Sequence, residues 1–333
     1  MTLAADAEQF QPLPALLPEN WQENMFFILW DTTTQHGFMM HIQRVPGRQV
    51  QEARIVACIA GQIASATITG AFDQDRPVRG VDVHVNDAFR DLEVRADFMG
   101  AAGPGPLGFI AAHPGGDVPV MVDVKLRSAL APIDFAEGLA TLTAALRADK
   151  SAPQMGDQAH YEQGGTWTGT IRIGQRQVHA TGLFVRDHSW GIRHEHNNFR
   201  AFWTATCLDN GNVFCNAIGM PVGDGFVGIG GYCDASGVRF TQQVAASYTP
   251  EPGLLTYERT EVTYGAGVDL VVRGEVQQHW PMYLPFSGRD RYDNNALSAV
   301  EANGLRGFAV MEWATTLDPA NTAVLDAAAS IRA

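Results

Sequence analysis

The sequence predicts an all-β protein built from two packed antiparallel β domains, and three observations support this fold class. Short segments of alternating apolar and polar residues recur roughly every ten residues, as in sandwiches and barrels. Glycine and proline are frequent, with 34 and 17 residues, as expected for many strands joined by turns. The chain of 333 residues is long enough for one large β domain or two of ordinary size.

The first half reads as strands that follow an irregular, proline-containing lead-in over residues 1–20. Phe38, Met40 and Ile42 share one face of an expected strand, because they alternate with the residues between them. A turn is expected after this strand, over residues 45–48. Further strands are expected over residues 53–69, 81–85, 92–96 and 118–126.

A short linking helix is expected over residues 132–150. Asp134 and Glu137 have the spacing of a capping box. Apolar residues then recur at near-helical spacing, at Phe135, Leu139, Leu142 and Leu146. A loop containing proline and glycine follows, so we place the boundary between two β domains here, with the first over residues 1–150 and the second over 151–333.

The second half resumes the strand pattern. A strand over residues 165–173 leads through a turn at Gly174 into a long strand, Val178–Trp190. Asn210-Gly211 lies between two apolar segments and predicts a hairpin. Further strands are expected around Tyr232 and Phe240 and over residues 257–264, 268–276 and 307–315.

Composition excludes several classes of partner. The formal net charge is −13 and no stretch gathers lysine and arginine, which argues against nucleic acid and against an anionic membrane surface. No segment has the pattern of a signal peptide or is apolar enough for stable insertion into a membrane. The four cysteines form no C-x-x-C pair. We therefore expect a cytoplasmic protein with reduced, mostly buried cysteines; the sequence leaves a homodimer open.

The densest polar segment runs from Arg186 to Asn198 and includes Asp187-His188-Ser189-Trp190-Gly191. In an extended strand, His188 and Trp190 share one face with Arg186, whereas Asp187 lies on the other face. Burial of either face buries ionisable groups, which is costly unless they are paired. The segment is therefore a candidate functional site, and the structural alternative is a network in which Asp187 ties strands together, for example through Arg193.

His188 and Trp190 suit proton transfer to a carbon–carbon double bond. A histidinium can protonate an alkene, and the face of an indole stabilises the resulting cation. A nearby carboxylate, Asp187 or Glu312, would set the charge of the histidine or take a proton back. Arg193 would position a carboxylate or anchor a substrate oxygen.

Other polar residues are weaker candidates. His194 and His196 form an H-x-H pair, and with His188 they define a metal-dependent alternative. Residues 223–228 match G-x-G-x-x-G, but no helix pattern follows, so we interpret them as a hairpin and not as a dinucleotide site. Candidate substrate-binding residues, each also explicable as a strand end, a turn or a solvated loop residue, are His160, Glu162, Tyr232, Asp234 and His194.

Two segments resemble a known family. His160-Tyr161-Glu162-Gln163 and residues 182–193, which contain Arg-Asp-His-Ser-Trp-Gly-Ile-Arg, are similar to the lipocalin-like superfamily of AttH and carotenoid 1,2-hydratase (hydroxyneurosporene synthase). Residues 307–312 look like the closing strand of that family. The organisational resemblance covers about residues 21–315, and the match is specific around Asp187–Arg193.

The resemblance implies two lipocalin-like β-barrel or half-barrel domains. In the hydratase, water adds to an isoprenoid double bond without a cofactor, and the His-x-Trp element of its site maps onto His188 and Trp190. The Tyr-x-Asp pair of the hydratase has its counterpart only in the more distant Tyr232-Cys233-Asp234, since the corresponding strands carry Cys207, Asp209 and Asn216.

The sequence thus predicts a cofactor-independent lyase or isomerase, of hydratase, dehydratase or cyclase type. Its expected substrate is an apolar, alkene-bearing small molecule such as a terpenoid, steroid or polycyclic aromatic. Two alternatives stay open: a non-catalytic protein that binds a lipophilic ligand, and a metal-dependent enzyme that uses His188, His194 and His196. Neither the substrate nor the direction of the reaction follows from the residues alone.

Overall fold

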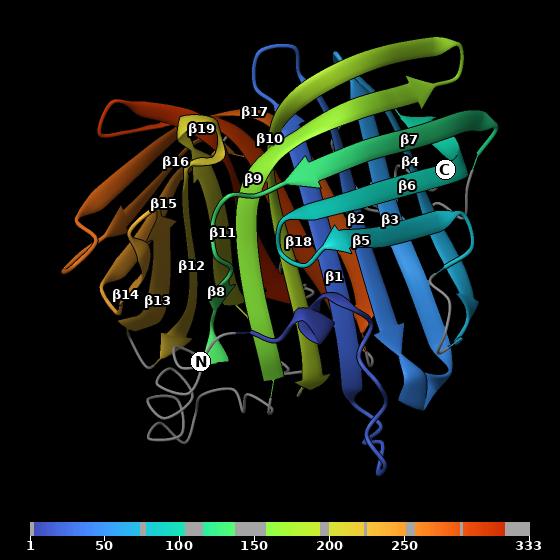
Figure 1. Cartoon of the computed structure of the whole chain (residues 1–333), viewed down its shortest axis with the longest axis horizontal. Coiled ribbons are helices and arrows are strands. Elements are labelled where there is room, and N and C mark those ends of the chain that lie inside the picture. The colour runs from blue at the N-terminus through green and yellow to red at the C-terminus, as the bar shows by residue number, and fades with distance from the viewer. Residues whose placement is uncertain are drawn as a thin grey trace.

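The described part of the chain folds almost entirely into antiparallel β-strands that form two sheets (Figure 1). The structure is a computed structural model, and it describes residues 3–73, 78–103, 116–136, 158–193, 200–222, 225–250, 257–286 and 289–316. The all-β fold class expected from the strand pattern is confirmed. In the described residues, no helix has the length and apolar character needed to cross a membrane.

The first sheet has ten strands within the described residues. They are β1 (Trp21–Asp31), β2 (His36–Val45), β3 (Val50–Ile59), β4 (Gln62–Ala71), β5 (Val81–Asp87), β6 (Asp91–Gly103), β7 (Val118–Arg127), β8 (Ile133–Asp134), β9 (Gln158–Ile173) and β10 (Arg176–Ile192). The pairings run from β10 through β1, β2, β3, β4, β6 and β7 to β9, and β9 pairs again with β10. The first sheet is therefore closed into a barrel.

This closure corrects the expected domain boundary. Residues 158–192, assigned above to the second domain, form β9 and β10 of the first sheet. The reason is long-range pairing: β10 pairs with β1 over residues 183–192, and β9 pairs with β7. The motif Asp187–Gly191 consequently lies in the first barrel. Most of the expected linking helix, from residue 137 to 150, lies outside the described residues, and Ile133–Asp134 forms the short strand β8.

The second sheet has nine strands in the described residues and stays open, as a half-barrel. Its order is β14-β13-β12-β11-β19-β18-β17-β16-β15. The strands are β11 (Arg200–Leu208), β12 (Val213–Val222), β13 (Gly225–Asp234), β14 (Gly237–Thr241), β15 (Val244–Pro250), β16 (Tyr257–Tyr264), β17 (Leu270–Phe286), β18 (Arg289–Ala302) and β19 (Leu305–Thr316). The hairpin predicted at Asn210-Gly211 joins β11 to β12. β12 and β13 pair antiparallel, with Val222 opposite Gly225, and residues 223–224 of the second predicted hairpin lie outside the described residues.

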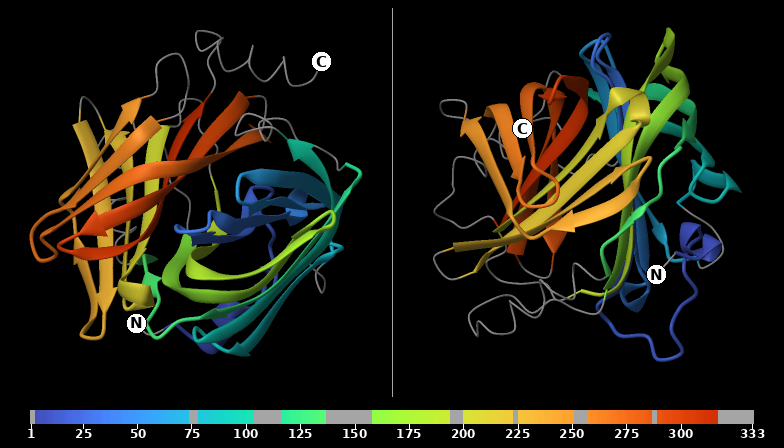
Figure 2. Two further views of the ribbon diagram at one scale, coloured as in Figure 1. Left: turned by 90° about the horizontal axis from the view of Figure 1, so that it is seen from above. Right: turned by 60° about the vertical axis from the view of Figure 1, so that its left-hand side comes forward.

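Three hydrophobic clusters form the core. One fills the first barrel and includes Phe27, Leu29 and Phe184. A second covers the inner face of the second sheet. The third lies between the two sheets, where Phe26, Val185 and other residues of the barrel pack against the second sheet. Figure 2 shows the two sheets lying side by side. All four cysteines are buried free thiols, as expected.

Candidate functional site

Strand β10 divides its side chains between two buried environments. Phe184 belongs to the cluster inside the first barrel, and Val185 belongs to the cluster between the sheets. Because side chains alternate along a strand, Arg186 and His188 point into the barrel and Asp187 points toward the second sheet. The predicted separation of His188 from Asp187 is therefore confirmed.

On the barrel side, Arg186 forms a buried ion pair with Glu8 of the short 3₁₀ helix η1 (Ala5–Glu8). Its Nη2 and Nη1 lie 2.5 Å and 2.9 Å from the two Glu8 carboxylate oxygens. The same Nη2 donates to Gln163 Oε1 at 2.7 Å. Two parallel charge-assisted bonds of this kind are among the stronger polar contacts in proteins. Arg186 therefore attaches the N-terminal segment to the barrel.

His188 serves the same attachment. Its Nδ1 lies 2.9 Å from the carbonyl oxygen of Ala7, and its Nε2 lies 3.0 Å from Glu23 Oε1. Glu23 is in turn paired with Arg44 at 2.6 Å. Trp190 lies beside His188, with ring centroids 4.8 Å apart. Since both ring nitrogens are engaged and the side chain is 2% exposed, His188 has the surroundings of a structural histidine. We call Glu8, Glu23, Arg44, Arg186 and His188 the interior cluster.

On the opposite face, His160 of β9 lies between two carboxylates. Its Nε2 is 3.1 Å from Asp187 Oδ2 and 3.2 Å from Glu162 Oε1. Strand register explains the grouping, since Glu162 pairs with Asp187 and His160 pairs with Ser189. Phe135 stacks on the His160 ring, with centroids 5.3 Å apart. Three predicted site residues therefore come together here.

The two carboxylates change the acidity of the histidine. Burial by itself lowers the pKa of His160, but the charge of Asp187 and the hydrogen bonds to Asp187 and Glu162 outweigh it and raise this pKa to about 10. Burial also raises the pKa of Glu162, and His160 opposes part of that rise. His160 is therefore an imidazolium at neutral pH.

Trp203 of β11 completes this group from the second sheet. Its Nε1 donates to Glu162 Oε1 at 2.7 Å, and its ring lies 5.8 Å from that of Phe26. The contact requires the two sheets to lie close together, and Gly164 of β9 permits this. A Cβ at this position would lie only 2.5 Å from Cδ2 of Phe214 on β12. We call His160, Glu162, Asp187 and Trp203 the interface cluster.

One atom of the interface cluster has no partner within the described residues. Glu162 Oε2 is buried and makes no hydrogen bond. Buried polar atoms are nearly always satisfied, so such an atom marks a position where a proton, a water or a ligand atom is expected. The ligand-type atoms of His160, Glu162 and Asp187 also lie within 4.8 Å of one another, close enough to hold a metal ion.

Two further predicted residues, Glu312 and Arg193, lie on the second sheet and at the end of β10. Glu312 of β19 is buried and pairs in register with Trp203, so it lies on the second sheet and not beside His188. Arg193 follows β10 and donates to Ser189 Oγ at 2.6 Å, and its backbone N–H donates to Asn20. Arg193 thus ties the end of β10 to the lead-in of β1.

The remaining candidates lie apart from both clusters or outside the described residues. Tyr232 and Asp234 belong to the β13–β14 hairpin, where Arg239 pairs with Asp234 at 3.1 Å and lies over the Tyr232 ring. Tyr232 packs against the core on the inner face of the second sheet. His194 and His196 lie outside the described residues, and the metal alternative that uses them stays a prediction.

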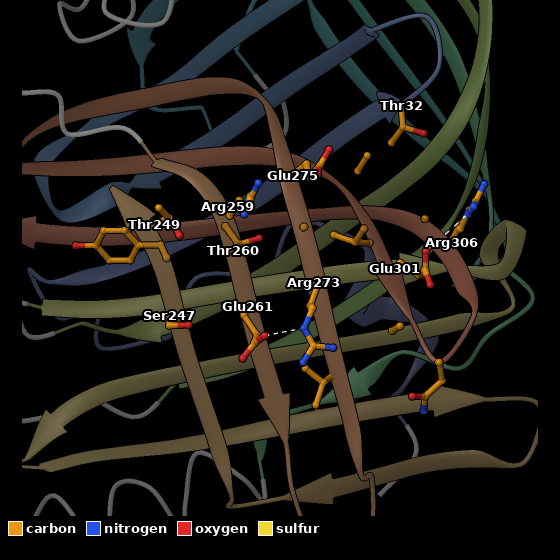
Figure 3. A pocket seen from close by; sticks show the side chains of 18 residues that line it. Thr32, Ser247, Thr249, Arg259, Thr260, Glu261, Arg273, Glu275, Glu301 and Arg306 are labelled. Carbon is orange, nitrogen blue, oxygen red and sulfur yellow. Dashed lines mark hydrogen bonds and ion pairs between the residues drawn. The ribbon is translucent and has the colours of Figure 1, made fainter. Parts of the chain in front are cut away.

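A cleft of about 1060 Å³ opens along β15 to β19 and is bordered by Thr32 of the first barrel (Figure 3). None of the residues that line it belongs to the interface cluster. Its lining carries ionic side chains such as Arg259 and Glu275, and an ion pair of 2.8 Å joins Arg273 to Glu261. A lining of this kind does not suit an apolar substrate.

Two residues that hold these clusters together carried no signal in the sequence. Glu8 lies in the proline-containing lead-in and has no motif around it. Trp203 lies in an ordinary apolar strand, and its contact with Glu162 spans 41 residues of sequence. Only the pairing of the strands and the packing of the sheets reveal either one.

The fold is that of a lipocalin-like β protein, with a closed barrel and a half-barrel, and the interface cluster lies between the two. The chain belongs to the DUF7064 family, which is described as a domain of unknown function and whose model matches residues 5–317. The curated proteins contain no match to the sequence.

Solved structures confirm the resemblance at the level of the fold. An AttH-like protein from Nitrosomonas europaea is 15% identical, with a TM-score of 0.59 over 88% of this chain and 92% of the other. CghA is 11% identical, with a TM-score of 0.50 over 91% of this chain and 90% of the other. CghA solved with Sch210972 gives the same values.

Proposed function

We propose that the protein is a cofactor-independent lyase or isomerase that acts by acid–base chemistry on an apolar, alkene-bearing small molecule. The observation that carries the proposal is the position of His160 between two carboxylates, at the buried junction of the two sheets. Perturbed acid–base groups of this kind are enriched at functional sites. The proposed substrate class is a terpenoid, steroid or polycyclic aromatic, because apolar core residues such as Phe26 and Phe135 surround the cluster.

The proposed reaction begins with proton transfer from the His160 imidazolium to one carbon of the double bond. The pKa of His160, raised to about 10, keeps this proton in place at neutral pH. The new cation at the neighbouring carbon is stabilised by the indole face of Trp203 and by the carboxylates. The Asp187 carboxylate then takes a proton from the carbon on the other side of the cation, which gives an isomerised alkene. That proton returns from Asp187 to His160, so the cycle needs no co-reactant.

The shared fold supports the proposal. CghA has been solved together with Sch210972, so one protein of this fold holds a further molecule. Two roles differ from the sequence-based expectation: His160 replaces His188 as the proton donor, and Trp203 replaces Trp190 as the indole that stabilises the cation. We assign the proton donor to His160, since both ring nitrogens of His188 are engaged in holding the N-terminal segment.

The test begins with extraction of any ligand that copurifies and its identification by mass spectrometry. The protein is then incubated with this ligand in D₂O, and deuterium at carbon is followed by NMR. We expect protein-dependent deuterium incorporation that Asp187→Asn slows by about 100-fold or more. Asp82→Asn, which neutralises an exposed aspartate of the same sheet, is the matched control and should have no effect.

Two results would contradict the proposal. Tight binding without incorporation or turnover would favour a non-catalytic binding protein. Loss of activity on treatment with EDTA, with recovery on addition of one metal, would favour a metal-dependent enzyme that uses the same three ligand-type residues.

A further inference from the structure

The interior cluster has the chemistry of a carboxylate-binding site that the chain itself occupies. Arg186 and Glu8 are each 3% exposed, and the guanidinium holds both oxygens of the Glu8 carboxylate. The Gln163 side chain accepts a hydrogen bond from the guanidinium, and the centre of the Tyr161 ring lies 5.4 Å from the guanidinium carbon Cζ. This arrangement is preorganised for any carboxylate that reaches the end of the barrel.

The segment that supplies Glu8 is held without strand pairing. Described residues 3–20 belong to no strand of either sheet. The segment is anchored instead by His188 at the Ala7 carbonyl, by Glu23 at the Gln11 N–H, and by stacking of Phe10 against Arg44. Residues 14–17, which follow it, are exposed, with Leu16 at 90%. The segment can therefore leave the barrel without breaking a β ladder.

Departure of the segment would leave Arg186 buried without an anion. An unpaired buried charge costs several kcal/mol, so an incoming anion is needed to replace Glu8. Phe10 also packs against the apolar core of the barrel, and its place would be vacated at the same time. The replacement ligand therefore needs a carboxylate for the Glu8 position and an apolar portion for the Phe10 position.

We propose that this end of the first barrel binds a monocarboxylic acid with an apolar tail, and that Ala5–Gln11 is an internal competitor for the same site. The carboxylate of the ligand pairs with Arg186, and the tail lies where Phe10 packs. This site is separate from the interface cluster and does not depend on the function proposed for it.

The test compares binding of decanoate to the full-length chain and to two variants by titration calorimetry. Glu8→Gln weakens the internal competitor, so decanoate should bind about tenfold more tightly or better. Glu19→Gln, which removes an exposed glutamate from the same lead-in, is the matched control and should bind like the wild type. 1-Decanol should bind far more weakly than decanoate to Glu8→Gln. Equal affinities of Glu8→Gln and Glu19→Gln for decanoate, or equal binding of the acid and the alcohol, would overturn the proposal.

A second measurement uses the wild-type chain, in case Glu8→Gln folds poorly. Saturating decanoate should speed hydrogen exchange at the amides of Ala7, Gln9 and Gln11, which are bonded within the segment or to Glu23. 1-Decanol at the same concentration should leave these amides protected. Protection that persists in saturating decanoate would show that the acid does not displace the segment, and the proposal would be wrong.

Discussion

The two faces of the β9–β10 strand pair each bury a histidine beside a carboxylate, but the two environments differ in how their charges balance. In the interior cluster, Arg186 is paired with Glu8 and Arg44 with Glu23, so two positive charges face two negative charges, and His188 lies between the Ala7 carbonyl and Glu23. In the interface cluster, His160 faces both Asp187 and Glu162, and a buried oxygen of Glu162 has no partner. A cluster whose charges are all paired stabilises a structure, whereas a cluster with an unpaired charge or polar atom can take up a proton or a ligand.

The comparison shows that neighbouring residues of one motif serve two different purposes. His188 holds the N-terminal segment against the barrel, and Asp187, one residue earlier, faces the second sheet with His160. Before a shared function is assigned to polar residues that are adjacent in a strand, it must therefore be known which face of the strand each one lies on.

The largest expected effect is on catalysis at the interface cluster. His160→Asn removes the proposed proton donor and keeps a polar side chain, so turnover should fall by about 10²- to 10⁴-fold. Turnover of the copurified ligand, or of its nearest analogue, is the measurement. His179→Asn replaces an exposed histidine of β10 and should retain full activity. Retention of turnover in His160→Asn would move the reaction away from this cluster.

The next effect is on stability at the interior face. Arg186→Gln breaks a buried ion pair and should lower the free energy of unfolding by about 3 kcal/mol. Arg127→Gln breaks an exposed pair with Asp91 in the same barrel and should cost about 1 kcal/mol or less. Urea denaturation measures both. The account of the interior cluster as a structural attachment fails if the two variants lose the same stability.

The interface cluster also predicts a dependence of stability on pH. The pKa of His160 is raised from 6.5 to about 10 on folding, so the folded state binds this proton more tightly than the unfolded state. The resulting stabilisation is fully present below about pH 6.5 and is lost as the pH rises through about 10. The stability difference between wild type and His160→Asn should therefore shrink from pH 6 to pH 10. A difference that stays constant over this range would contradict a charged His160.

The smallest expected effect is at Trp203. Trp203→Phe keeps an aromatic face but removes the hydrogen bond to Glu162, which should cost about 1 kcal/mol of stability. Turnover should fall by less than about tenfold, since the ring still covers the site. Unfolding curves and initial rates of this variant measure the two effects. A loss of turnover as large as that of His160→Asn would assign the N–H group of Trp203 a direct part in the reaction.

Local patterns predicted most of the strands and the faces of β10, because both depend on neighbouring residues in the sequence. They did not predict β15 or β18. They did not predict that β9 and β10 close the first barrel, since that depends on β10 pairing with β1 across more than 150 residues of sequence. His160, Glu162 and Asp187 were each candidates, but the register of β9 against β10 brings them together. Glu8 had no local signal, because its importance depends on Arg186, which is 178 residues away.

The central claim is that the ligand reacts at the interface cluster, on the side of β10 that faces the second sheet, and not at the interior cluster inside the barrel. Ring ¹⁵N spectra of the histidines, recorded with and without the copurified ligand, test this claim directly. The account predicts that His160 is an imidazolium at neutral pH whose signals shift when the ligand binds, while the signals of His188 stay unchanged. Ligand-dependent shifts at His188 with an unaffected His160 would contradict it.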